Sequence, residues 1–200
     1  MASSPTQLLL DYIQTCVFVY LHNRKIYSEN TFDRRRAFDV IVQTTRQPEL
    51  LAYVSESLSS VKPWIERGEL KQICAVLMDQ KGNVAERLDF EFLRFEDVVH
   101  HTPGVLSKLL NKDLARAGLV RLSRLQLPEF TCVNFSLAFE IEEKTPSATS
   151  KASEMWIAKD APSLPNIQEE TRQSTLPVIT LADANVDSRI CIKVETTLLK

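Results

Sequence analysis

The chain has 200 residues, of which 44% are hydrophobic and 25% are charged, values ordinary for a single globular domain. Its formal net charge of -2 at pH 7 argues against a protein that holds nucleic acid through overall positive charge. No apolar run approaches the roughly 20 residues of a membrane-spanning helix, and the N-terminus lacks the features of a signal peptide. We therefore expect a protein of the cytosol or nucleus.

The residue types that usually carry catalysis or metal binding are few and lack the usual spacing. The three histidines include the adjacent pair His100 and His101, which cannot share one helical face as zinc ligands do. The sequence contains no GxSxG, P-loop or GxGxxG motif. We expect no enzyme, no cofactor and no metal site.

All four cysteines have apolar neighbours, and none lies in a CxxC pair. Free buried thiols in a reducing compartment are the interpretation we favour, with disulfides as the alternative. The cysteines are Cys16, Cys74, Cys132 and Cys191.

Hydrophobic periodicity predicts helices and strands in alternation over the first three quarters of the chain. Gly82 suits a tight turn, and Gly118 in a helix indicates a close contact on that side. Strands joined by hairpins, with helices between them, indicate the α+β class, an antiparallel sheet backed by helices. The expected elements are a helix over 6–22 that is apolar nearly all round, a strand that ends near 45, a helix from 48 with a kink or break at Pro63, a hairpin of strands over 70–78 and 84–95, a helix over 105–125 and a strand over 131–142.

Residues 144–200 carry three short apolar patches, separated by polar, proline-bearing spacers. Isolated strands of three or four residues are not stable in water, so we expect two or three short strands that dock on the sheet. Trp156 has no local core, so it either fills a gap in the domain or covers a binding groove. The patches are 155–157, 176–179 and 190–192.

Two groups of basic residues stand out, the triplet 34–36 and a stripe of Lys108, Lys112 and Arg116 at i, i+4 spacing. For the triplet we favour a solvated entrance to a strand, with contact to phosphate or to an acidic partner as the alternative.

Short motifs in a fixed order run through nearly the whole chain. They are Ile26-Tyr27, Phe32 with 34–36, 48–50 with Tyr53, 61–63 with 65–67, 75–77, 84–87, 115–117, 153–157, 176–178 and 194–195. This ordered series resembles the HORMA-domain family, and within that family it is similar to the accessory subunit of translesion DNA polymerase zeta.

The resemblance implies one HORMA-type domain over 1–200, with an antiparallel sheet backed by three helices over about 5–143 and a C-terminal safety belt over about 144–200. In this family the belt wraps a short partner peptide that adds to the sheet as a strand. Lys112 and Arg116 match the basic region of the third helix that pairs with another HORMA protomer. The positions that match the peptide site are Tyr53, Trp156, Leu176, Pro177 and Val178, together with Cys191 and Lys193, where this chain departs from the family's residues.

The resemblance further implies a non-enzymatic adaptor of the nucleus, present also in the cytoplasm. It would bind a proline-containing hydrophobic peptide of the catalytic subunit of DNA polymerase zeta and connect it to other translesion or repair factors. Three alternatives stay open: a spindle-checkpoint HORMA protein that binds kinetochore or anaphase-regulator peptides, a small enzyme whose tail covers a pocket, and a protein that binds DNA through its two basic groups.

Overall fold

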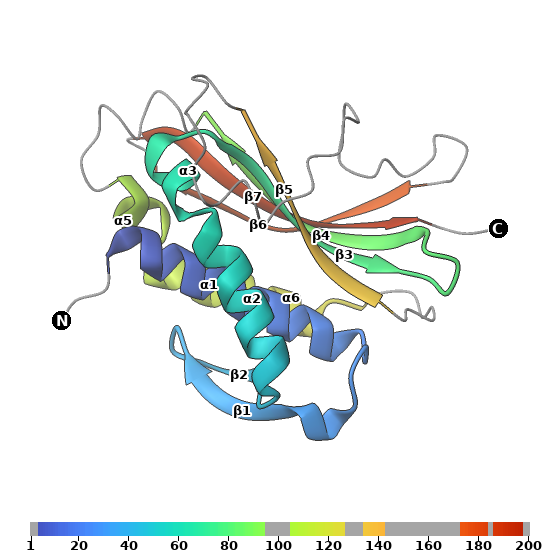
Figure 1. Ribbon diagram of the computed structural model, residues 1–200. Coiled ribbons are helices and arrows are strands. Elements are labelled where there is room, and N and C mark those ends of the chain that lie inside the picture. The colour runs from blue at the N-terminus through green and yellow to red at the C-terminus, as the bar shows by residue number, and fades with distance from the viewer. Residues whose placement is uncertain (1–3, 95–104, 127–133, 143–172, 184–185, 198–200) are drawn as a thin grey trace.

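The computed structural model describes residues 4–94, 105–126, 134–142, 173–183 and 186–197. A five-stranded antiparallel sheet lies over a layer of helices, and a two-stranded sheet lies on the far side of that layer (Figure 1). The helices are α1 (Pro5–Asn23), α2 (Pro48–Ser60), α3 (Lys62–Arg67), α5 (Val105–Leu109) and α6 (Lys112–Arg124), with a 3₁₀ turn at Glu29–Thr31. The strands are β1 (Phe32–Ala37), β2 (Val40–Thr45), β3 (Leu70–Met78), β4 (Val84–Leu93), β5 (Asn134–Ile141), β6 (Gln173–Asp183) and β7 (Val186–Thr197).

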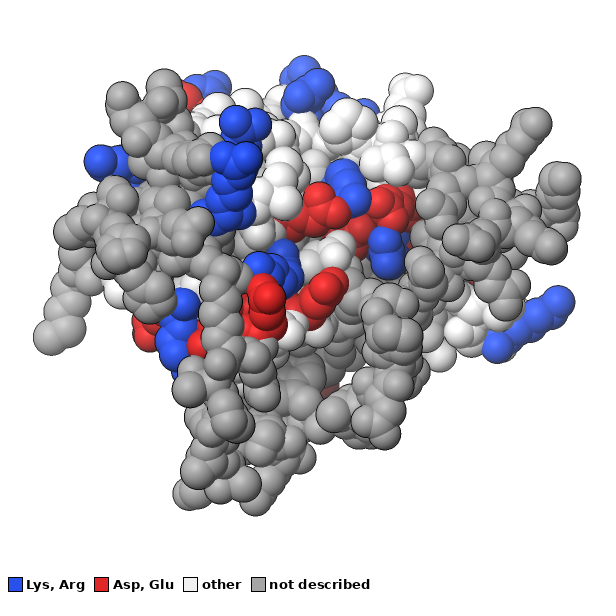
Figure 2. All heavy atoms as spheres, turned by 90° about the horizontal axis from the view of Figure 1, so that it is seen from above, with Lys and Arg blue, Asp and Glu red and all other residues white. Residues whose placement is uncertain are grey.

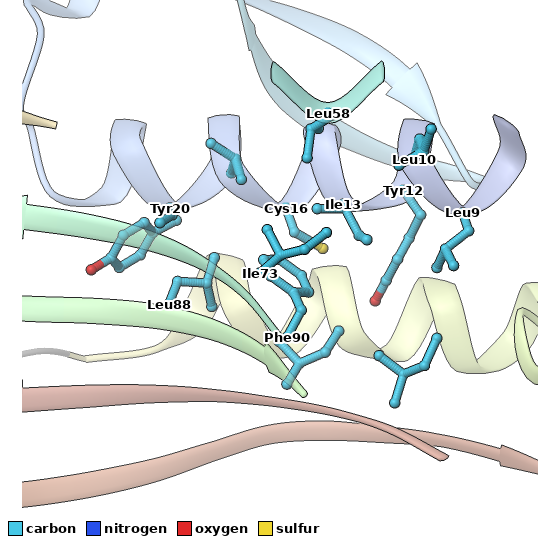
Figure 3. Close-up of a cluster of buried hydrophobic side chains, with 14 of the residues drawn as sticks. Leu9, Leu10, Tyr12, Ile13, Cys16, Tyr20, Leu58, Ile73, Leu88 and Phe90 are labelled. Carbon is cyan, nitrogen blue, oxygen red and sulfur yellow. The ribbon is translucent and has the colours of Figure 1, made fainter. Parts of the chain in front are cut away.

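Helix α1 is the centre of the hydrophobic core. The hydroxyl of Ser4 accepts a hydrogen bond from the backbone N–H of Gln7 at 3.1 Å, and Pro5 occupies the first turn, so this sequence starts a helix. Figure 3 shows Ile13 and other side chains of α1 between the helices and Phe90 of the sheet. The predicted helix with apolar residues nearly all round is confirmed.

The strand order of the large sheet is β5-β3-β4-β7-β6. Strands β3 and β4 form the predicted hairpin, and Gly82 in its turn has a φ of 82°. Strand β7 pairs with β4 and strand β6 pairs with β7, so these two strands, here called the C-terminal hairpin, lie at the edge opposite β5. Strand β5 pairs with β3 on one side, and no described strand pairs with its other side.

The strand predicted to end near residue 45 is present as β2, but β1, which pairs with it in a hairpin, was not predicted. Phe38 and Asp39 have φ values of 49° and 59°, the left-handed conformation that a tight two-residue turn requires. The hairpin was missed because its turn contains no glycine and the apolar alternation continues across it.

The helix predictions were right about one break and missed another. Pro63 lies in the first turn of α3, where its missing N–H is tolerated, and α2 ends before it, which confirms the break. The continuous helix predicted over 105–125 was wrong, because α5 and α6 are separate. The side chain of Asn111 accepts a hydrogen bond from the N–H of Asp113 at 2.8 Å and caps a new helix there.

The C-terminal strands are longer than predicted, with 11 residues in β6 and 12 in β7. Their polar residues fit because side chains alternate between the two faces of a strand. Ile190, Ile192 and Val194 are buried against the helices, while Cys191 and Lys193 face the other way.

Three cysteines are free thiols: Cys16 and Cys74 are buried, as predicted, whereas Cys191 is half-buried. Cys132, Trp156 and the pair His100 and His101 lie outside the described residues. None of the described helices is both long and apolar enough to cross a membrane.

Candidate functional site

The outer edge of β5 lies beside α2. The backbone N–H of Leu137 donates a hydrogen bond to the hydroxyl of Tyr53 at 3.0 Å, so it points away from β3. Because the direction of backbone N–H and C=O groups alternates along a strand, every second residue of β5 presents these groups toward the same edge. Such an edge can accept one further strand.

Aromatic rings border this edge. The ring of Tyr53 is 41% exposed and meets Phe135 edge to face, with 6.0 Å between the ring centroids. Burial raises the pKa of the neighbouring Tyr27 phenol, and the phenol of Tyr53 raises it further. An exposed aromatic ring beside an open strand edge gives an incoming peptide side chain an apolar surface to pack on.

The predicted belt residues lie at the opposite edge of the sheet. Leu176 and Pro177 of β6 pair with Val194 and Lys193 of β7, and Val178 is buried in the core. Strands β3, β4 and β7 separate β6 from β5. The structure therefore does not bring the 176–178 run together with Tyr53, and one added strand could not lie beside both.

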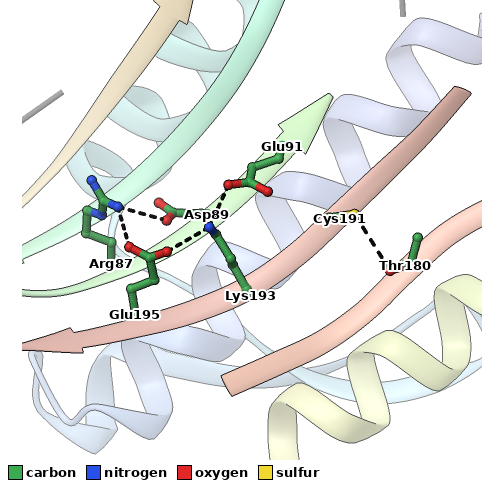
Figure 4. A network of polar contacts seen from close by, with 7 residues as sticks. All are labelled: Arg87, Asp89, Glu91, Thr180, Cys191, Lys193 and Glu195. Carbon is green, nitrogen blue, oxygen red and sulfur yellow. Dashed lines mark hydrogen bonds and ion pairs between the residues drawn. The ribbon is translucent and has the colours of Figure 1, made fainter. Parts of the chain in front are cut away.

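Lys193 belongs to a row of ion pairs on the face of the sheet that points away from the helices (Figures 2 and 4). Its ammonium group lies 2.6 Å from Glu91 and 2.7 Å from Glu195, and Glu195 also pairs with Arg87. Every one of these residues lies on β4 or β7, so the charges cross the seam where the C-terminal hairpin meets β4. We call Arg87, Asp89, Glu91, Lys193 and Glu195 the ionic row.

The pKa values within the ionic row shift in different directions. Burial alone would raise the pKa of Glu195, but hydrogen bonds from Lys193 and Arg87 outweigh it and lower that pKa. Asp89 is fully buried and 3.3 Å from Arg87; its burial dominates and raises its pKa, against the lowering effects of the nearby Cys74 thiol and of the charge of Arg87. Glu195 is thus held charged, whereas the charge on Asp89 is disfavoured.

Three further predicted residues lie elsewhere. Lys112 and Arg116 are exposed on α6, one turn apart, so the structure presents both on the same side of that helix. Cys191 is half-buried on β7, and its sulfur accepts a long hydrogen bond from Thr180 at 3.7 Å. Among the described residues, no group of three or more histidine, cysteine or acidic side chains is placed to hold a metal ion.

Comparison with known sequences gives two informative relatives, although no family model matches the chain. The mitotic spindle assembly checkpoint protein MAD2B of Gallus gallus is 27% identical over 116 residues, 58% of this chain and 54% of that protein. The DNA polymerase zeta processivity subunit of Arabidopsis thaliana is 24% identical over 153 residues, 76% of this chain and 70% of that protein. The matched stretch thus spans about half the length of MAD2B.

Solved structures match over nearly the whole chain. A chain of the mitotic checkpoint complex superposes with a TM-score of 0.72 at 13% identity, covering 96% of this chain and 97% of that one. The structure of C. elegans HTP-1 bound to HTP-3 motif-1 superposes with a TM-score of 0.70 at 12% identity, and the match covers 98% of this chain and 92% of that one. The fold is that of a HORMA domain. The resemblance to the HORMA family, and within it to the accessory subunit of DNA polymerase zeta, is confirmed.

Sequence reasoning missed one polar cluster in this HORMA fold. Glu86 is fully buried on the face of β4 that points toward the helices, where it pairs with Arg24 and Thr196. The signal was present, because Glu86 shares the alternation of Leu88 and Phe90, and a carboxylate on the apolar face of a strand needs a partner.

Proposed function

We propose that this protein is a non-catalytic adaptor that binds a short partner peptide as an additional strand on the outer edge of β5. The observation that carries the proposal is the sheet order, which puts the C-terminal hairpin on β4 and leaves the outer side of β5 without a described strand. In this binding mode backbone hydrogen bonds supply affinity, while pockets for alternate side chains select the sequence.

The partner we propose is a proline-containing hydrophobic peptide from the catalytic subunit of DNA polymerase zeta. The similarity to a processivity subunit of that polymerase supports this choice. The exposed ring of Tyr53 supports the proposal that the peptide contains proline, because proline-rich segments dock on aromatic surfaces. In this role the protein acts in the nucleus, also occurs in the cytoplasm, and joins the polymerase to other translesion or repair factors.

The segment over 144–200 acts in this proposal as the safety belt that keeps the peptide bound, with Trp156 as a peptide contact. A trapped peptide leaves only after belt strands detach, so release is slow. Leu176, Val178 and Lys193 help to retain the peptide indirectly, because they hold the belt on the sheet. Leu176 pairs with β7, Val178 is buried in the core, and Lys193 forms an ion pair with Glu91 of β4.

The proposal is tested by capture of peptides from a library of proline-containing sequences, with the intact chain and a chain that ends at Glu143. The intact chain should retain a defined set of hydrophobic, proline-containing peptides with dissociation over minutes or longer. The shortened chain should lose slow dissociation. Equal retention by both chains would contradict the belt, and no retention by either would contradict the adaptor function.

A second candidate is a spindle-checkpoint function, which the name of the MAD2B relatives favours. The same edge of β5 would then bind kinetochore or anaphase-regulator peptides. Affinity purification of the tagged chain from cells distinguishes the two. Recovery of polymerase zeta subunits supports the first function, and recovery of anaphase-promoting-complex partners alone supports the second.

A further inference from the structure

A buried ion pair joins the end of α1 to the seam between β4 and β7. Nε of Arg24 donates a hydrogen bond to Oε1 of Glu86 at 2.5 Å, and Nη2 of the same guanidinium pairs with Oε2. The hydroxyl of Thr196 on β7 also donates to Oε2, at 3.0 Å. One carboxylate of β4 is therefore held by the residue that follows α1 and by the C-terminal hairpin.

The carboxylate of Glu86 has no access to solvent, and the side chain of Arg24 is only 7% exposed. Removing a charge from water is costly unless an opposite charge and hydrogen bonds compensate it. Thr196 contributes one neutral hydrogen bond, whereas Arg24 contributes the positive charge that pairs with Glu86. The burial of Glu86 thus depends on Arg24.

Strand β7 is one of the elements that bury Glu86. Glu86 and Thr196 are direct cross-strand partners in the β4–β7 ladder. If β7 left β4, that side of β4 would become a sheet edge and water would reach the carboxylate. Docking of the C-terminal hairpin therefore includes desolvation of Glu86.

We infer that the Arg24–Glu86 pair is a lock on the C-terminal hairpin: β7 docks stably on β4 only while Arg24 neutralises Glu86. Without Arg24, undocking of the hairpin relieves the uncompensated charge, and it leaves the β5-β3-β4 pairing intact. The guanidinium of Arg24, placed directly after α1, thereby determines whether the C-terminal hairpin stays docked on β4. This inference goes beyond the proposed function and needs no bound peptide.

The test is hydrogen–deuterium exchange of the full chain without any ligand. Arg24→Met keeps the length of the side chain but removes its charge. It should increase exchange over 173–197 by about tenfold or more relative to β3, because an unpaired buried charge costs more than a lost neutral hydrogen bond. Thr196→Val, of nearly the same shape, should increase exchange in the same segment by a smaller factor, and Thr196→Ser should not.

The double substitution Arg24→Met with Glu86→Met should restore protection of 173–197, since an apolar pair needs no compensation. The matched control is Arg46→Met, which breaks an exposed pair with Asp33 and should leave exchange of the hairpin unchanged. Equal increases in exchange over β3 and over the hairpin would overturn the inference of a lock, because they would indicate general destabilisation of the fold. A double variant as loose as the single one would overturn it too.

If Arg24→Met does not fold, the remaining variants decide the question. A folded double variant together with a hairpin-specific effect of Thr196→Val supports the lock. Identical exchange in Thr196→Val and Thr196→Ser overturns it. Neither result depends on whether a partner peptide exists, so failure of the lock and failure of the adaptor function are separate outcomes.

Discussion

The hydroxyl of Tyr53 accepts a hydrogen bond from the backbone N–H of Leu137 at 3.0 Å, so α2 occupies a bonding position on the outer edge of β5. A peptide that extends the sheet past Leu137 has to replace this bond with its own carbonyl group. The aromatic ring and the hydroxyl of Tyr53 therefore have opposite effects on peptide binding.

Substitutions at Tyr53 separate the two effects. Tyr53→Ala removes the apolar surface and should weaken binding of a captured peptide about tenfold or more, the usual effect of truncating an aromatic contact. Tyr53→Phe keeps the ring and frees the N–H of Leu137, so affinity should equal or exceed that of the unsubstituted chain. Isothermal titration calorimetry measures both. Equal loss in the two variants would show that the hydroxyl itself binds the peptide.

Gly118 sets how closely α6 approaches both α1 and the C-terminal hairpin. A Cβ at this position would lie 2.3 Å from the hydroxyl of Tyr12 and 2.9 Å from Cγ2 of Ile179. Gly118→Ala should therefore lower the free energy of unfolding by about 1–3 kcal/mol, as overpacking does, in spite of the better helix propensity of alanine. Chemical denaturation measures the change.

Tyr12→Phe is the companion variant, because it removes the nearest atom of that contact. The pair Gly118→Ala with Tyr12→Phe should recover part of the lost stability. An undiminished loss in the double variant would place the conflict at Ile179 instead.

The prediction that Gly118 marks a close contact came from the sequence, and so did most of the secondary structure. Periodicity located β3, β4 and β5, because apolar alternation reports burial on one face directly. It missed the turn at Phe38 and Asp39, because these residues adopt the left-handed conformation without a glycine in the sequence to indicate it. It also missed the helix start at Asn111, because asparagine caps a helix only where the chain already begins one.

The candidate site was less predictable, because it depends on which strands are neighbours. No local sequence pattern indicates that β5 lies at one edge of the sheet and β6 at the other, because the strand order depends on pairing between segments that are distant in the sequence. The partners of Glu86 lie 62 and 110 residues away along the chain. The sequence therefore indicated only that a charged residue lies on the apolar face of a strand, and not which residues pair with it. The resemblance supplied Tyr53, and the structure supplied its contact with Leu137.

The ionic row should make stability depend on pH in a known direction. The pKa of Glu195 is lowered in the folded state, so its contribution is present above the ordinary carboxylate range and is lost as the pH falls through the folded pKa. Burial would lower the pKa of Lys193, but its hydrogen bonds to Glu195 and Glu91 outweigh burial and raise that pKa, so its contribution is lost only when the pH rises far above neutrality.

The variant Lys193→Met tests this assignment. The difference in unfolding free energy between the unsubstituted chain and Lys193→Met should be largest near pH 7 and should shrink as the pH is lowered from there through the lowered pKa of Glu195. Urea denaturation at several pH values measures it, with Lys62→Met, at an exposed pair 4.0 Å long, as the control. A difference that is constant over this range would show that Lys193 acts through packing.

Arg116 is exposed on α6, with Lys112 one turn before it, and the proposed role of both is pairing with a second HORMA protomer. Arg116→Ala should reduce self-association without a change in thermal stability, since exposed charges contribute little to folding. Sedimentation of the chain over a range of concentrations measures the effect. The neighbouring Arg121→Ala serves as a control on the same helix, and equal effects of the two variants would indicate general charge loss.

Amide exchange of the complex shows whether a partner peptide adds to the outer edge of β5. The probe is a proline-containing hydrophobic peptide from the catalytic subunit of DNA polymerase zeta, added to the full chain in saturating amount. If the peptide pairs with β5, new protection should appear in β5, around Leu137, without a comparable change in β6. Protection confined to β6, at the opposite edge of the sheet, would contradict that pairing.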